Sequence, residues 1–511
     1  MGYRILQVKL PTNYSDDDIR LIISKKLGLS DFSYQLEKKS LDARKKNDIH
    51  WLTSIVVTSG HLSSNEYTEP ESITIPYKKR GKTVIVVGSG PAGFFAAHVL
   101  QLAGFNVTIV ERGSEVAQRS LAIQRLEKKG EFSPQNNYAF GEGGAGTFSD
   151  GKLTSRSKHI SSERLYILSE YVKAGAPKEI SYMTHPHVGT DILKVVVANL
   201  RQMFLNNGGE FLFNTMLEDV LIKNNRVEKV VCNNAELQAD YIIFATGHSA
   251  YETYRMLIRR GIQIGTKNFA IGHRIEHQQR LINLAQWGKE SLPGVKAAEY
   301  RLNTSTSSGL PVYTFCMCPG GYVVPAAAYA EKSVVNGMSY YKRDGVFSNA
   351  ACVAGVHPDM LLGHKCTASE ILDWMDKLED QFYNFSNNYV IPAVKAIDYE
   401  NRRESKEISS GSYRLGVSPA PLYNMIPEIV SKALSEGLNN FSKKLKGFES
   451  GVMMGLESKT SSPVQVIREK TGRCPGFDNL FFVGEGSGYA GGIISSASDG
   501  VKCAKSIIDS L

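Results

Sequence analysis

A short glycine-rich motif is the strongest chemical signal in this sequence. Gly88-Ser89-Gly90-Pro91-Ala92-Gly93 has the spacing GxGxxG, which lets the backbone of a tight turn approach a phosphate. The apolar run Thr83–Val87 precedes it and predicts a buried strand of a parallel sheet. The motif opens a predicted helix, Pro91–Ala103, and a second strand is predicted over Phe105–Val110. Strand, turn, helix and strand in this order predict a dinucleotide-binding unit.

Each glycine of the motif has its own predicted role. Gly88 permits the tight turn, Gly90 lets the backbone approach a pyrophosphate, and Gly93 lets the helix pack against the strand. The helix N-terminus offers unpaired N–H groups and a partial positive charge to the phosphates. Glu111 follows the second strand, where its carboxylate would accept hydrogen bonds from the ribose hydroxyls. An acid at this position disfavours a 2′-phosphate, so FAD or NAD is favoured over NADP.

Two later segments decide between these dinucleotides. Ile242–Gly247 is an apolar strand ending in Ala-Thr-Gly, and Leu480–Gly486 is a strand ending in Gly-Glu-Gly. With the first motif, in this order, they resemble the glutathione-reductase-like FAD superfamily. The resemblance implies that the Ala-Thr-Gly turn packs beside the cofactor and that Glu485, where most members have Asp, holds a ribityl hydroxyl. It also implies that the helix beginning at Gly491-Gly492-Ile493 directs its N-terminus at the flavin pyrimidine edge, where negative charge develops on reduction.

Several longer motifs are similar to those of a narrower family. They are Phe140–Leu153, Phe244–Ala250, Cys316–Val324, Glu457–Val464 and Gly484–Ile493. These segments resemble an uncharacterised family of FAD-dependent, or NAD(FAD)-utilising, dehydrogenases, which implies non-covalent FAD. Five glycines within residues 141–151 also free the backbone to approach a ligand and to donate N–H groups, although a flexible loop without a ligand has the same composition.

The predicted FAD site combines residues of these motifs with their neighbours. Thr147 and Lys152 would add a hydroxyl and a cation near the pyrophosphate or the flavin. No metal site is predicted, because Cys316-Met317-Cys318 lacks the companion pair that zinc needs. The full predicted cofactor-binding set is Gly88, Gly90, Pro91, Ala92, Gly93, Glu111, Arg112, Gly143, Gly146, Thr147, Lys152, Val220, Ala245, Thr246, Gly247, Gly484, Glu485, Gly491, Gly492 and Ile493.

No catalytic constellation stands out, and His248 and Cys318 are the two candidates. His248 directly follows the Ala-Thr-Gly turn, where it would be a general acid or base or a structural hydrogen-bonding residue. Cys318 and Cys316 suggest a redox dithiol. A CxC pair is awkward for an intramolecular disulfide, however, so burial or pocket lining is the favoured interpretation.

For two further pairs of polar residues the sequence leaves two alternative roles open. His185 and His187 flank Pro186, where they would line a site or cap a turn. Arg274 and Glu276 lie where the chain should cross between domains, so they would face a pocket or form a buried structural pair.

These motifs together predict an FAD-dependent oxidoreductase, a dehydrogenase that transfers hydride between a small-molecule substrate and flavin N5. A second GxGxxG motif is absent, since Gly261–Gly265 lacks a preceding buried strand. NADH or NADPH would therefore donate electrons transiently, without a dinucleotide domain of its own. The alternatives are an FAD-binding RNA-modifying or RNA-associated protein and a non-catalytic flavoprotein.

Composition is typical of a large globular protein. The chain has 511 residues, 42% hydrophobic and 22% charged, which predicts two or three domains. The net charge of +8 is a mild positive field, and the basic clusters lack interleaved aromatic residues, so nucleic-acid binding is disfavoured. No apolar stretch approaches the roughly 18 residues of a membrane span. Seven scattered cysteines indicate a reducing compartment, and we expect the cytoplasm.

The elements that position the motifs predict an α/β fold. We expect a Rossmann-like FAD domain in two parts, residues 79–268 and 449–511, with an α+β substrate domain inserted at 269–448. Residues 1–78 should form a small α/β unit of ferredoxin-like type. Within it, Ser15 and Asp18 predict a capping box at the start of a helix. Asn224-Asn225 predicts a hairpin between strands 217–223 and 227–232.

Overall fold

A parallel five-stranded sheet carries the glycine motif in the computed structural model, which describes residues 2–63, 67, 71–155, 157, 159–409 and 411–511. The strand order is β22-β10-β4-β5-β6. The first four strands along the chain lie between residues 83 and 244, whereas the fifth comes from near the C-terminus. They are β4 (Thr83–Val87), β5 (Asn106–Val110), β6 (Glu210–Leu212), β10 (Tyr241–Phe244) and β22 (Leu480–Phe482).

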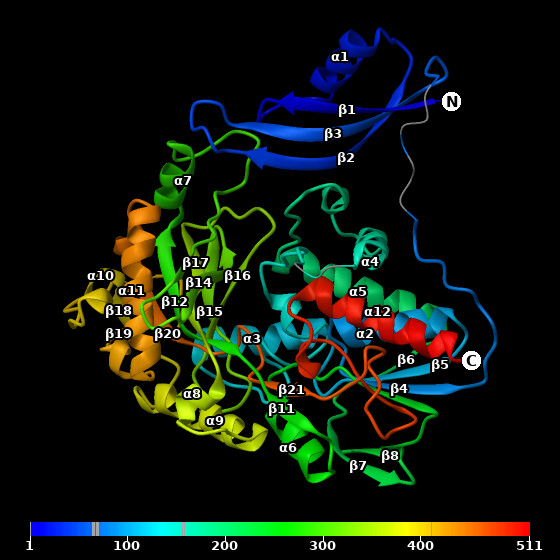
Figure 1. Cartoon of the computed structure of the whole chain (residues 1–511), viewed down its shortest axis with the longest axis vertical. Helices are drawn as coiled ribbons and strands as arrows, with labels where there is room; N and C mark the ends of the chain where they lie inside the picture. Colours follow the sequence, from blue (N-terminus) through cyan, green and yellow to red (C-terminus); the bar gives the residue numbers. More distant parts are fainter. Residues whose placement is uncertain (1, 64–66, 68–70, 156, 158, 410) are drawn as a thin grey trace.

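Both faces of this sheet are covered, as the continuous apolar strands predict. Val84 and Val86 pack into a cluster with helices α2 (Pro91–Leu102) and α12 (Ile493–Asp509), which lie side by side in Figure 1. Ile85 and Val87 face a second cluster. The further elements of this unit are α3 (Val116–Lys129), η1 (Ala145–Phe148), α4 (Ser161–Lys173), η2 (Lys178–Ser181), α5 (Thr190–Asn206), β7 (Leu217–Lys223), β8 (Arg226–Cys232), β9 (Glu236–Leu237) and α6 (Tyr251–Arg259). The hairpin predicted at Asn224-Asn225 is confirmed.

A seven-stranded sheet forms the second large unit, with the order β13-β14-β17-β12-β20-β18-β19. Its neighbouring strands are antiparallel except β18 and β19. The strands are β12 (Phe269–Gln278), β13 (Asn303–Ser305), β14 (Pro311–Cys318), β17 (Phe347–Val356), β18 (Ile391–Lys395), β19 (Val417–Pro419) and β20 (Val452–Glu457). Around it lie α7 (Gln279–Trp287), α8 (Pro358–Leu362), α9 (Ala368–Asn384), α10 (Ala396–Glu400), η3 (Leu422–Asn424), α11 (Glu428–Lys444) and η4 (Phe448–Ser450).

The position of β20 corrects one predicted boundary. The sequence places the last dinucleotide-domain segment from residue 449 onward, yet β20 lies between β12 and β18 in the seven-stranded sheet. Met453 and Met454 are fully buried there, which explains why this strand stays with the inserted unit. Two small ribbons complete the chain: β15 (Gly321–Pro325) with β16 (Val335–Ser339), and β11 (Ile264–Thr266) with β21 (Val464–Val466); η5 (Glu485–Ser487) precedes α12.

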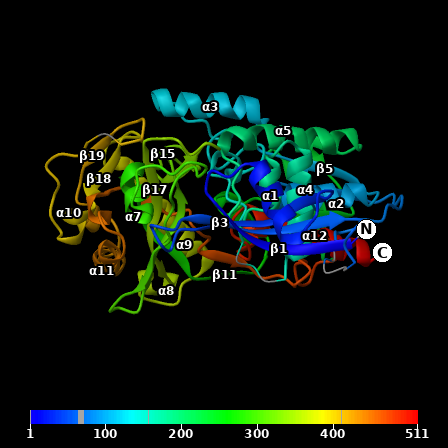
Figure 2. The same ribbon diagram turned by 90° about the horizontal axis from the view of Figure 1, so that it is seen from above.

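The N-terminal unit is a separate antiparallel sheet, which Figures 1 and 2 show beside the two larger ones. Its elements are β1 (Gly2–Leu10), α1 (Asp16–Leu27), β2 (Ser33–Asp42) and β3 (His50–Ser59), and β3 lies between β1 and β2. This order and sheet arrangement match the first four elements of the β-α-β-β-α-β ferredoxin-like fold. The capping box of Ser15 and Asp18 is confirmed. Hydrogen bonds from Lys39 N to Tyr182 O (2.8 Å) and from Thr184 N to Lys39 O (2.9 Å) join the unit to the rest.

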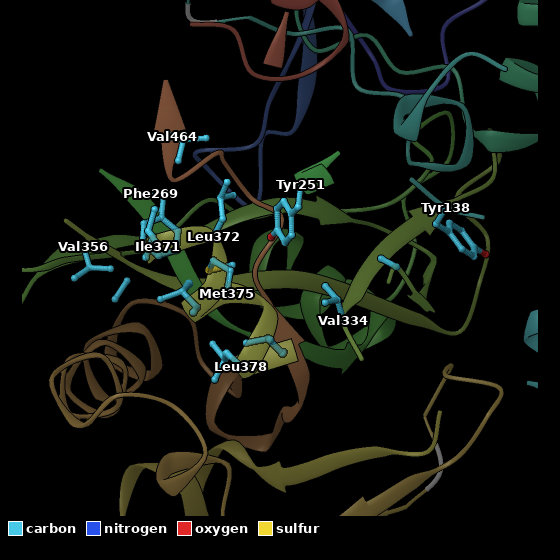
Figure 3. Close-up of a cluster of buried hydrophobic side chains, with 14 of the residues drawn as sticks. Tyr138, Tyr251, Phe269, Val334, Val356, Ile371, Leu372, Met375, Leu378 and Val464 are labelled. Carbon is cyan, nitrogen blue, oxygen red and sulfur yellow. The ribbon is translucent and has the colours of Figure 1, made fainter. Parts of the chain in front are cut away.

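The largest apolar cluster joins the two large sheets. It contains Val87 and Val110 of the parallel sheet together with Ile271 of β12 and Met375 of α9. Figure 3 shows the part of this cluster that surrounds Tyr251 and Met375. Because one continuous core spans both units, the two large sheets are held in a fixed arrangement. No helix of the described residues is long and apolar enough to cross a bilayer.

Candidate functional site

The glycines of the first motif have two different roles. A Cβ on Gly88 would lie 2.5 Å from Ala245 O, and one on Gly93 would lie 2.0 Å from Gly88 O. Gly88 also has a left-handed φ of 102°. Both positions therefore require glycine for packing. A Cβ on Gly90 would meet no atom closer than 3.9 Å, the Cα of Gly144. Gly90 thus leaves free space above the turn.

Two helix N-termini open toward this space. Gly90 caps α2 and Gly492 caps α12. Among the described residues, neither helix has a side-chain cap on its first-turn N–H groups, although Glu485 accepts from the N–H of Gly492 itself at 2.6 Å. Neither first turn holds an acidic residue. A Cβ on Gly492 would meet nothing within 4 Å. Uncapped N–H groups with a partial positive charge form a site for anionic groups.

The Gly-rich loop brings the separate motifs together. Gly143 N donates to Ser89 Oγ at 3.3 Å, which ties the loop to the first motif. A Cβ on Gly144 would lie 3.1 Å from Gly90 Cα, and one on Gly146 would lie 3.1 Å from the Ile493 side chain. The predicted residues of three distant segments therefore converge.

Glu111 links the first motif to the loop. Its carboxylate accepts hydrogen bonds from Ser89 N (3.1 Å), Ser89 Oγ (2.7 Å), Gly113 N (3.0 Å) and Gly141 N (3.2 Å). These four donors match the roughly four acceptor positions of a carboxylate. In this structure the acid orders two glycine segments, and the predicted ribose contact stays a prediction.

A buried arginine that the sequence motifs do not contain organises the same loop. Arg119 of α3 is fully buried and donates to the carbonyls of Asn137, Tyr138, Gly141, Glu142 and Gly144 at 2.7–3.2 Å. Burial lowers the pKa of Arg119 to about 10, so the guanidinium remains charged at neutral pH. Its position three residues after Val116 and four before Ile123, on the apolar face of the helix, is the signal that could have identified it.

The other end of the site is built around Glu485. Its Oε1 accepts from Gly492 N at 2.6 Å, and its Oε2 lies 3.1 Å from His248 Nδ1. Burial acts to raise the pKa of Glu485, but His248, the Gly492 N–H and Lys267 outweigh it, and the pKa lies below its ordinary value. An ionised Glu485 fixes the proton of His248 on Nδ1. His248 Nε2 is buried and has no hydrogen-bond partner among the described residues.

The remaining predicted cofactor residues occupy varied positions. Ala245 N donates to Val87 O at 2.8 Å, and Val220 is buried within β7. Arg112 pairs with Glu252 and lies 3.8 Å above the ring of Phe140. Thr147 Oγ1 donates to Glu142 O at 3.3 Å. Pro91, Ala92, Thr246, Gly247, Gly484 and Gly491 keep the places their motifs give them, at the two helix starts and at the turns after β10 and β22.

Lys152 lies in a charged cluster rather than at the first motif. The Nζ of Lys152 is 3.2 Å from Glu299 Oε2. Asp150, two residues before Lys152 in the chain, pairs with Arg343. Burial acts to raise the pKa of Glu299, but Lys152 and Arg343 outweigh it and hold the pKa at about 2. His187 borders the cluster through Tyr341 O at 3.1 Å, whereas His185 is exposed.

Arg274 pairs with Glu457 rather than with Glu276, which corrects the expectation of a buried Arg274–Glu276 pair. Arg274 Nη1 donates to Glu457 Oε2 at 3.0 Å, and Nη2 donates to Cys316 O at 2.7 Å. Glu276 instead accepts from Ser412 N at 3.0 Å. Burial raises the pKa of Glu276 to about 7. In the register of β12 with β20, Glu457 lies opposite Gly272, two residues before Arg274, and a bulge separates these two positions of β12.

Two family models match parts of this chain. Residues 82–282 match the family described as pyridine nucleotide-disulphide oxidoreductase, and residues 268–460 match a family described as FAD-dependent protein, C-terminal domain-like. A thiamine thiazole synthase of Aeropyrum pernix is 33% identical over 201 residues, 36% of this chain and 61% of that protein. A glycine oxidase structure from Bacillus cereus aligns with 84% of this chain and 95% of its own at 13% identity and a TM-score of 0.34.

One relative matches along its whole length. An uncharacterized protein of Clostridium beijerinckii is 39% identical over 536 residues, which covers all of this chain and 99% of that protein. The aligned region spans the N-terminal unit and both large sheets. The chain therefore belongs, with the Clostridium beijerinckii protein, to a family of FAD-dependent oxidoreductases.

Proposed function

We propose that this FAD-dependent oxidoreductase transfers hydride between a small-molecule substrate and flavin N5 in the crevice between the two large sheets. The observation that carries the proposal is the meeting of three glycine-rich segments at two uncapped helix N-termini. Crevices of this kind, between a parallel sheet and an adjoining unit, are the usual place for cofactor and substrate.

The residues present fit the cofactor. The space above Gly90, which a Cβ would partly fill, would admit the pyrophosphate to the N–H groups of α2. The N-terminus of α12 would face the flavin ring and favour negative charge at its edge. When bound, the flavin supplies a two-electron centre that accepts or donates hydride.

His248 is proposed as the group that moves the substrate proton. Glu485 orients the ring through Nδ1 and leaves Nε2 with a free lone pair. Such a nitrogen accepts a proton from a hydroxyl or an amine while the adjoining carbon gives up hydride. Lys152 and Arg343, at the loop end, would line the substrate side of the crevice.

The test is an anaerobic absorbance titration of the purified full-length protein with NADH and, in parallel, with NADPH. Bleaching of the oxidised flavin band would support the proposal and identify a nicotinamide donor. A flavin band that persists with both nucleotides, and with a panel of amines and alcohols, would contradict hydride transfer. Absence of a flavin band after reconstitution with FAD would contradict the cofactor site itself.

A further inference from the structure

Cys316 and Cys318 lie at an irregular point of the inserted sheet. Residues two apart in a strand point to the same face. Between Phe315 and Cys318 the pairing of β14 with β17 shifts by one residue, because Phe315 pairs with Ala351 but Cys318 pairs with Asn349. Cys316 has a φ of 44°, in the left-handed region that non-glycine residues rarely adopt. Strain of this kind concentrates at functional sites.

We propose that Cys316 and Cys318 form a redox-active dithiol that reduces low-molecular-weight disulfides. The Cys318 thiol donates a hydrogen bond to the backbone carbonyl of Cys316 at 3.4 Å, and the two cysteines differ in exposure: Cys316 is partly exposed, whereas Cys318 is fully buried. Cys316 is therefore the attacking thiol and Cys318 the resolving one. Proteins that exchange disulfides use this division between an accessible and a protected sulfur.

The guanidinium of Arg274 contacts both cysteines. Arg274 Nη2 lies 3.4 Å from Cys318 Sγ and donates to Cys316 O, and Glu457 holds the other guanidinium nitrogen. The neighbouring Cys318 thiol lowers the pKa of Cys316 below the ordinary thiol value; burial opposes this, and Arg274 and Lys152 add to the lowering. The same contact and burial raise the pKa of Cys318, so the thiolate of the pair is favoured at Cys316.

In the other five cysteines the thiol pKa is raised, in contrast to that of Cys316. All are buried, and burial raises the pKa of Cys352 to about 12 and that of Cys232, Cys366 and Cys474 to about 11. The pKa of Cys503 is raised as well. The segment 82–282 that matches the pyridine nucleotide-disulphide oxidoreductase family holds Cys232 as its single cysteine. This segment therefore cannot supply a dithiol on its own.

The reaction balances without another reactant. The Cys316 thiolate attacks one sulfur of the external disulfide, the S–S bond breaks, and the released thiolate takes a proton to become a free thiol. Cys318 loses its proton and attacks the sulfur of Cys316 in the mixed disulfide. An internal disulfide forms, and a second free thiol leaves. The two cysteines are oxidised by two electrons, and the external disulfide is reduced to two thiols. This chemistry does not depend on hydride transfer at the flavin.

The test uses the full-length, FAD-loaded protein and 5,5′-dithiobis(2-nitrobenzoate) as the disulfide. The native chain should release two equivalents of coloured thiolate in the fast phase and keep no bound thionitrobenzoate. Cys318→Ser should release one equivalent and retain the mixed disulfide at Cys316, whereas Cys316→Ser should lose the fast phase. Cys474→Ser, a buried control, should behave as the native chain. Peptide mapping of the native chain should find the 316–318 disulfide.

Two results would overturn the proposal. One is a fast phase that persists in Cys316→Ser. The other is a native chain that releases one equivalent, retains the label and shows no internal disulfide by peptide mapping. The second readout needs no variant, so misfolding of a substituted chain leaves the test intact.

Discussion

Arg343 holds Asp150 by two hydrogen bonds, from Nε to Oδ1 at 3.0 Å and from Nη2 to Oδ2 at 2.5 Å. Asp150 ends the Gly-rich loop of the parallel-sheet unit, whereas Arg343 follows β16 of the inserted unit. Both side chains are buried. This ion pair joins the two parts of the chain across the crevice that we propose as the active site.

Asp150→Asn should lower the free energy of unfolding by about 3 kcal/mol, because the buried Arg343 loses its bidentate partner and keeps only Glu299, 3.9 Å away. Burial acts to raise the pKa of Asp150, but Arg343 outweighs it and the folded pKa is lowered. The stabilisation is therefore present above the unfolded pKa of about 4 and is lost as the pH falls through the folded pKa. Urea unfolding measures the difference, with the exposed Asp344→Asn as a control. If both variants lose the same free energy of unfolding, the stabilisation does not come from the ion pair between Asp150 and Arg343.

Glu276→Gln should stabilise the protein at pH 8 and have little effect at pH 5. Burial raises the folded pKa of Glu276 to about 7, so the penalty of ionising this carboxyl grows from the unfolded pKa of about 4.5 and is complete above pH 7. At pH 8 the substitution should increase the free energy of unfolding by on the order of 3 kcal/mol. Thermal unfolding of both proteins across this pH range checks it. A gain that is the same at both pH values would exclude the ionisation as its cause.

A pair of glycine substitutions separates folding from cofactor binding. Gly93→Ala should unfold or strongly destabilise the parallel-sheet unit, since its Cβ would lie 2.0 Å from Gly88 O. Gly90→Ala fits the free protein, where the nearest atom is 3.9 Å away, and should change stability by less than about 0.5 kcal/mol. Its methyl group occupies the proposed phosphate position, so FAD affinity should fall at least tenfold. Flavin content and circular dichroism measure the two effects, and undiminished FAD binding by Gly90→Ala would contradict the site.

Arg119→Met should loosen the Gly-rich loop without unfolding the protein. The substitution removes five hydrogen bonds to loop carbonyls, and each unsatisfied group costs about 1–3 kcal/mol unless water reaches it. Amide hydrogen exchange over residues 137–144 should rise most. Arg125→Met on the exposed face of the same helix is the matched control and should leave this exchange unchanged.

His248→Asn tests the proposed proton transfer. The Asn side-chain amide can replace the Nδ1–H contact to Glu485 but has no counterpart of Nε2. FAD should remain bound, while the rate of flavin reduction by substrate should fall by about 10²–10⁴. Stopped-flow absorbance gives this rate, with the exposed His185→Asn as control. An undiminished rate would remove His248 from the mechanism.

The parallel sheet could be predicted from sequence because its signals are local. The strand at Thr83–Val87, the turn and the helix after it lie within twenty residues, and the structure differs from the prediction by one residue at the helix end. The seven-stranded sheet could not be predicted in the same way. β12 carries His273, Arg274 and Glu276 in buried positions, which interrupts the alternation of apolar and polar residues that marks a strand. Its partners β17 and β20 are also remote in sequence.

The sequence motifs predict the candidate site, whereas the side chains that support its loop could not be predicted, for a physical reason. Motifs identify residues whose backbone must meet a ligand, such as Gly90 and Gly492. Arg119 and Arg343 act on the loop from other elements, and only the folded chain brings their side chains to it. Residues that act through tertiary contacts leave no fixed spacing in the sequence.

The order of the strands has a consequence for synthesis on the ribosome. β22 pairs with β10, yet the whole inserted unit separates them along the chain. At about 5–20 residues per second, the nascent chain exposes one edge of β10 for ten seconds or more before its neighbour emerges. The seven-stranded sheet, complete once β20 has left the exit tunnel, can fold first. The parallel sheet and α12 close last, so a nascent chain would capture its cofactor only after residues 480–509 have emerged.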